Sequence, residues 1–87
     1  VIDIASNTVI GTITVGLTPV DIVMTPDGSR VYVANSTSST LSAIDTATDT
    51  VIATIPVHFG PFSMAITPDN EKLYVSSPMD SIIDVID

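Results

Sequence analysis

The chain repeats itself with a period of 42 residues. When the sequence is shifted along itself by 42 positions without a gap, 18 of the 45 overlapping pairs are identical. The matching pieces include Thr25-Pro26-Asp27 with Thr67-Pro68-Asp69, and Tyr32-Val33 with Tyr74-Val75. A fixed period of about 20–50 residues is typical of solenoids, propellers and other arrays, in which one unit cannot bury its apolar face alone. The sequence therefore predicts a fold of stacked, similar units.

Within one period the pattern is that of an all-β protein. Val, Ile and Thr dominate, and short apolar runs are separated by turn residues such as Pro26-Asp27-Gly28. Four strands are predicted, at residues 20–24, 30–34, 40–45 and 50–57. Alternation in the fourth strand places Val51, Ala53 and Ile55 on one face. The first strand is apolar on nearly both faces, and we therefore expect it at the centre of an assembly.

The two ends of the chain are out of phase with the repeat. Residues 1–15 read as the end of one unit, residues 20–57 as a complete unit, and residues 62–87 as the first three strands of another. A repeat array needs about three units for stability. We therefore expect further units as partners, either from the same polypeptide or from other copies of the chain. The third strand occurs at both ends, and this duplication favours an excerpt of a longer chain.

The repeated motifs resemble those of the YVTN-type β-propeller family. Residues 19–35 and 41–57 carry the pattern, and the Tyr-Val-Thr-Asn tetrad stands as Tyr32-Val33-Ala34-Asn35 and as Tyr74-Val75-Ser76-Ser77. The second copy departs from the family at Ser77, at Asn70 and at His58. The resemblance implies blades of four antiparallel strands, with the first strand innermost, in a ring of about 4–8 blades. About two blades would be present, as a fragment or subunit of a larger ring.

Composition excludes several classes of partner and site. The net charge is −8 and the only cationic side chains are Arg30 and Lys72, which disfavours nucleic acid and anionic membrane surfaces as partners. No apolar run approaches the ~18 residues of a membrane span. Without cysteine there are no disulfides and no thiolate ligands. The 22 Ser and Thr residues suit exposed β surfaces and favour an extracellular or cell-surface location.

The resemblance implies that two kinds of loop share one face of the ring. These loops are residues 16–19 and 58–61 between blades, and residues 35–39 and 77–80 within blades. The candidate exposed positions for binding are Asn35, His58, Phe59, Met79 and Asp80. Phe59 and Phe62 serve either as binding anchors or in blade-to-blade packing. Asn35-Ser36-Thr37 also fits the N-glycosylation pattern.

No constellation in the sequence supports catalysis, a cofactor or a metal. His58 is the only histidine, and it is either a base or metal ligand at the channel mouth or an ordinary loop residue. We expect a non-enzymatic propeller segment of an exported or cell-surface protein that makes protein or glycan contacts. One alternative, drawn from the wider propeller superfamily, is part of a lyase, a lactonase or a cofactor-dependent oxidoreductase. Another is a two-blade unit that assembles into a ring or filament.

Overall fold

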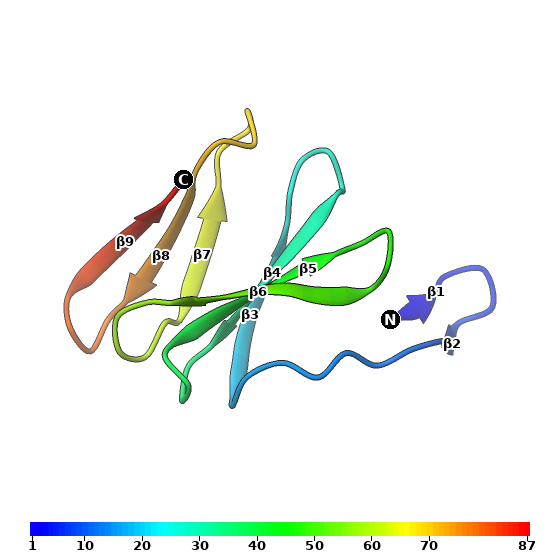
Figure 1. Cartoon of the computed structure of the whole chain (residues 1–87), viewed down its shortest axis with the longest axis horizontal. Coiled ribbons are helices and arrows are strands. Elements are labelled where there is room, and N and C mark those ends of the chain that lie inside the picture. Colours follow the sequence, from blue (N-terminus) through cyan, green and yellow to red (C-terminus); the bar gives the residue numbers. More distant parts are fainter.

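The computed structural model describes all 87 residues and consists of antiparallel β-sheets without a helix. A small hairpin is formed by β1 (Ile2–Asp3) and β2 (Thr8–Val9). A four-stranded sheet follows, made of β3 (Pro19–Met24), β4 (Arg30–Asn35), β5 (Thr40–Asp45) and β6 (Thr50–Pro56). A three-stranded sheet closes the chain, made of β7 (Ser63–Ile66), β8 (Leu73–Ser77) and β9 (Ile82–Ile86) (Figure 1). The predicted all-β class is confirmed, and no helix is present that could cross a membrane.

The turns between the first two strands of each sheet are held by the repeated Thr-Pro-Asp motif. Asp27 Oδ1 accepts hydrogen bonds from Thr25 Oγ1 at 2.7 Å and from the Ser29 backbone N–H at 2.9 Å. These bonds, chiefly the one from the Ser29 backbone, lower the pKa of Asp27 to about 2. Gly28 and Asn70 occupy the same turn position with φ of 75° and 69°. Asn tolerates this left-handed conformation better than other side chains, so the second copy keeps the turn without glycine.

One prediction about the faces of β6 was wrong. Ile44 pairs with Val51 and Ala43 pairs with Ala53, which leaves Ile52 as an extra residue in a β-bulge. The bulge reverses the alternation, so Val51 lies on the face of Ile44 and not on the face of Ala53. A strictly alternating pattern cannot reveal such an insertion.

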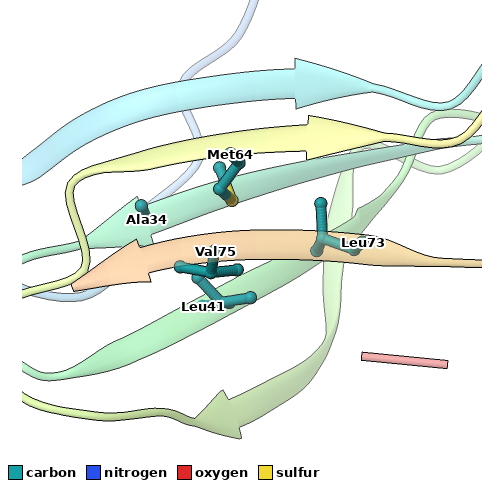
Figure 2. Close-up of a cluster of buried hydrophobic side chains, with 5 residues drawn as sticks. All are labelled: Ala34, Leu41, Met64, Leu73 and Val75. Atoms are coloured by element: carbon teal, nitrogen blue, oxygen red, sulfur yellow. The ribbon is translucent and has the colours of Figure 1, made fainter. Parts of the chain in front are cut away.

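The core lies between the two larger sheets. Ala34 and Leu41 of the four-stranded sheet pack with Met64, Leu73 and Val75 of the three-stranded sheet (Figure 2). Leu41 and Val75 are fully buried. The two sheets therefore stack face to face like neighbouring blades, and this stacking supplies the main apolar burial of the chain.

Polar contacts join the same two sheets along their inner strands and turns. The Met64 backbone N–H on β7 donates to Asp21 Oδ2 on β3 at 2.9 Å. Asn70 Nδ2 donates to Asp27 Oδ2 at 3.3 Å between the two Pro-Asp turns. Asp21 departs from the repeat, because its counterpart 42 residues later is Ser63. The departure is explained by this contact between blades.

The face of the four-stranded sheet that points away from the core is only partly covered. Ile22 and Met24 of β3, which we expected to be buried on both sides, are 65% and 59% exposed. They line an apolar hollow of about 450 Å³ with Ile13 and Val15 of the segment that precedes β3. The accessible surface is 5411 Å², compared with about 4,900 Å² expected from the surface scaling of a compact monomer of this mass. The structure thus presents apolar surface that a closed ring of blades would cover.

Candidate functional site

The loops expected on one face of the ring lie together in pairs. Residues 16–19 contact residues 35–39: the Leu17 backbone N–H donates to Ser38 Oγ at 2.8 Å, and the Ser36 backbone N–H donates to the Thr18 carbonyl at 2.9 Å. Residues 58–61 lie in the same way beside residues 77–80, where Ser77 Oγ donates to the His58 carbonyl. In each repeat the two loops therefore lie side by side, joined by different hydrogen bonds in the two copies.

Asn35 does not lie on the exposed surface where we expected it. Its side chain is fully buried at the end of β4, and Asn35 Nδ2 donates to Ser42 Oγ at 2.9 Å. Asn35 Oδ1 is buried as well and accepts no hydrogen bond. The reason for the burial is the neighbouring Gly16, since a Cβ at that position would lie 2.8 Å from Asn35 Cγ. A glycan on Nδ2 would require this side chain to leave its pocket.

His58 contacts the carboxylate of Asp84 through both its ring and its backbone. His58 Nδ1 lies 2.8 Å from Asp84 Oδ1, and the His58 backbone N–H donates to Asp84 Oδ2 at 3.0 Å. The bond from this backbone N–H is the main cause that lowers the pKa of the Asp84 carboxyl. The His58 side chain is 51% exposed and the Asp84 side chain 21%. The pair holds the imidazole in one orientation and leaves its second nitrogen, Nε2, available to solvent.

The His58–Asp84 pair replaces a different set of contacts found one repeat earlier. There, the three equivalent positions are Gly16, Asn35 and Ser42. The bulky Asn35 amide needs a glycine beside it and bonds the Ser42 hydroxyl.

In the second repeat these three positions are His58, Ser77 and Asp84. The small Ser77 makes room for a side chain at position 58, and the carboxylate of Asp84 takes over as the hydrogen-bond partner. The two sets fill the same place by different means, so the histidine has a structural explanation.

Four of the five expected binding residues lie on the surface, His58 among them. Phe59 is 58% exposed, Met79 is 76% exposed, and Asp80 follows Met79 on the same loop. Phe62 is 60% exposed, so neither phenylalanine packs between the two blades of the chain. A Cβ placed on Gly60 would lie 3.8 Å from Met79 Cγ, so the two loops lie close together. The two loops thus expose one aromatic and one thioether side chain, with the Asp80 carboxylate next in sequence to the methionine.

A second site, which we did not predict from the sequence, lies between the blades at the Pro-Asp turns. Arg30 and Lys72, the only two cationic side chains, both line a hollow of about 300 Å³ together with Tyr32, Glu71 and Asp87. Arg30 and Lys72 occupy the same position of successive repeats. That shared position is the signal from which their proximity could have been predicted, since neighbouring blades place equivalent residues side by side.

Comparisons with known proteins agree with this geometry. The family model described as "YNCE-like beta-propeller" matches residues 1–86. Hydrazine synthase of Kuenenia stuttgartiensis is similar to the chain with a TM-score of 0.80 and 30% sequence identity, over 92% of this chain and 23% of that one. No curated protein sequence shows a significant match.

A second solved structure, from Desulfotomaculum acetoxidans, is that of a functionally unknown protein. It has a TM-score of 0.68 and 19% identity, over 83% of this chain and 27% of that one. At this identity the likeness concerns the fold alone. The chain spans about a quarter of the length of each of these two proteins.

Proposed function

The chain belongs to the YNCE-like β-propeller family, and on that premise we propose that it is a non-enzymatic scaffold segment that presents a loop face for protein or glycan contacts. In this proposal the chain is part of an exported or cell-surface protein. Its repeats resemble the YVTN-type repeats of surface-layer propellers. The stiff pair of sheets provides the support, and the loops provide the recognition.

The observation that carries the proposal is the exposure of Phe59 and Met79 on adjoining loops. These two side chains are 58% and 76% exposed, although both are apolar. The equivalent positions of the first copy hold Leu17, which is itself 66% exposed, and Thr37. Apolar side chains that remain in solvent have no role in the core between the two sheets. Recognition of a partner explains why they are retained there.

Binding to an array of neutral and acidic oligosaccharides tests the glycan form of this proposal. We expect the labelled chain to bind a subset of the array, and the double variant Phe59→Ser/Met79→Ser to lose that binding. Ile52→Ser is the matched control, because Ile52 is 49% exposed on the outer strand β6, away from the loops. If the double variant bound as the parent does, the loop face would not be the recognition surface.

The location is tested separately. Antibody against the chain should label intact cells of the source organism, and surface-exposed material should be released by external protease. Labelling only after cell lysis would contradict the proposal of an exported protein.

A second candidate function is a segment of a propeller enzyme, and the likeness to hydrazine synthase favours it. In this reading the His58–Asp84 pair lies at the channel mouth and Nε2 of the imidazole acts as a base, since the carboxylate fixes the ring as general-base catalysis requires. Exchange of His58 for Gly, the residue of the first repeat, should then abolish turnover of the whole enzyme. Unchanged turnover would leave the pair with its structural role alone.

A further inference from the structure

The loop face carries no positively charged side chain apart from its single histidine. Arg30 begins β4 and Lys72 immediately precedes β8, so the only two cations of the chain lie beside the Pro-Asp turns, at the opposite end of the sheets (Figure 1). Three of the ten carboxylates belong to the loop end of the strands, namely Asp21, Asp80 and Asp84. A partner that approaches the loops therefore meets negative charge that no nearby cation neutralises.

Only one of these three carboxylates is free to bind a partner. Asp21 and Asp84 accept hydrogen bonds from backbone N–H groups of the chain itself. Asp80 is exposed, and its carboxylate takes part in no hydrogen bond and no ion pair. Its counterpart one repeat earlier, Ser38, accepts a hydrogen bond from the Leu17 backbone N–H. Asp80 thus has no structural contact of the kind that its counterpart makes.

The backbone beneath the neighbouring apolar side chains is fixed. Phe59 and Met79 project into solvent, whereas Gly60, which has φ of 68°, and Pro61 are buried between them and the sheets. Pro61 is one of the few fully buried residues of the chain. A partner would therefore pay little entropy for ordering this part of the surface.

The second repeat differs from the first in a way that suits an amphipathic, basic partner. Two hydroxyl residues, Thr37 and Ser38, stand where the second repeat has Met79 and Asp80. A thioether adapts its shape to different apolar side chains, and a guanidinium can lie against a phenylalanine ring. A carboxylate at the rim of such a patch attracts a cation and repels an acidic glycan.

On the basis of the function proposed above, we infer that the loop face binds a basic segment of another protein. An apolar side chain of that segment packs on Phe59 and Met79, and an adjacent arginine or lysine pairs with Asp80. The charge raises the rate of association and selects the partner, and the apolar contact sets the lifetime of the complex.

Fluorescence anisotropy with short labelled peptides tests the choice of partner. One set combines Arg and Lys with Leu and Phe, and a matched set carries Glu at every basic position. We expect the protein to bind members of the first set and none of the second, and the binding to weaken as sodium chloride is added, because salt screens exposed charges. Equal binding of the two sets, or binding that does not depend on salt, overturns the inference.

Two isosteric substitutions then locate the charge. Asp80→Asn should weaken binding of the basic peptides about two- to fivefold, the range for one exposed ion pair, chiefly through slower association. Asp49→Asn is the matched control: Asp49 is exposed in the turn between β5 and β6, at the opposite end of the sheets, and its counterpart one repeat earlier is Asn7. This control removes the same net charge and should bind as the parent does. Equal effects of the two substitutions would mean that only the overall charge matters, and would overturn the assignment of Asp80.

The oligosaccharide array described above separates the two ways in which the experiment can fail. If no basic peptide binds, but the array retains the parent and loses the double variant Phe59→Ser/Met79→Ser, the basic partner is overturned and the loop face keeps its proposed function in the glycan form. If the protein binds neither peptides nor oligosaccharides, both the basic partner and the proposed function are overturned.

Discussion

Leu41 and Ile83 occupy the same position of successive repeats, yet only Leu41 is buried. Leu41 is fully buried between the two larger sheets, whereas Ile83 is 64% exposed on β9. Truncation of a fully buried leucine to alanine costs about 3 kcal/mol, because it removes apolar contacts and leaves a cavity. The same truncation at Ile83 should cost less than about 1 kcal/mol, since it removes mainly solvated surface and some β propensity.

Urea denaturation followed by far-ultraviolet circular dichroism measures both free energies of unfolding. The protein must be dilute enough to be monomeric by light scattering, so that both losses refer to the isolated chain. We expect Leu41→Ala to lower the free energy of unfolding by at least about 2 kcal/mol more than Ile83→Ala does. If Leu41→Ala prevents folding, Val75→Ala provides a milder test: Val75 is also fully buried, and its truncation should cost about 2 kcal/mol.

Equal losses at Leu41 and Ile83 would refute the reasoning, because they would mean that the two sheets do not stack as the core in Figure 2 shows.

Three further changes probe the turns and the loop face. Gly28→Ala should lower the free energy of unfolding by about 1 kcal/mol, because Gly28 has a φ of 75° that strains any residue with a Cβ. Gly11 has open space around it and no such φ, so the control Gly11→Ala should lower the free energy of unfolding less in the same urea titration. Asp27 has a pKa of about 2 in the folded chain, below its unfolded value. Its contribution to stability is therefore present above about pH 4 and is lost as the pH falls toward 2. The stability of Asp27→Asn should depend less on pH in that window, and a profile identical to that of the parent would contradict this assignment. Asp84→Asn weakens the hydrogen bonds that the Asp84 carboxylate makes with the backbone N–H and the ring of His58. We therefore expect a lower melting temperature and shifted NMR resonances of the His58 ring. Unchanged resonances would mean that the pair is not formed in solution.

The strands could be predicted from the sequence because their signals are local. Alternating Val, Ile and Thr residues between turn motifs located β3 to β6 to within one residue at each end. The bulge at Ile52 could not be predicted, because an inserted residue in a strand leaves the composition unchanged and depends on the partner strand. The burial of Asn35 could not be predicted either, because a polar residue after a strand suggests a loop, and only the adjacent Gly16 creates the space that it fills.

A departure from the repeat does not by itself indicate a function, and the contacts of His58 show why. A single departure, such as histidine at position 58, invites a functional interpretation because its counterpart is glycine. The structure shows that the departure belongs to a set of three, in which Ser77 yields space and Asp84 supplies the hydrogen-bond acceptor. Departures that compensate one another preserve a packing arrangement, and their joint occurrence is the physical sign of a structural role. Phe59 and Met79 remain in solvent and take no part in the core between the two sheets, so they are the positions at which recognition by another molecule is to be sought first.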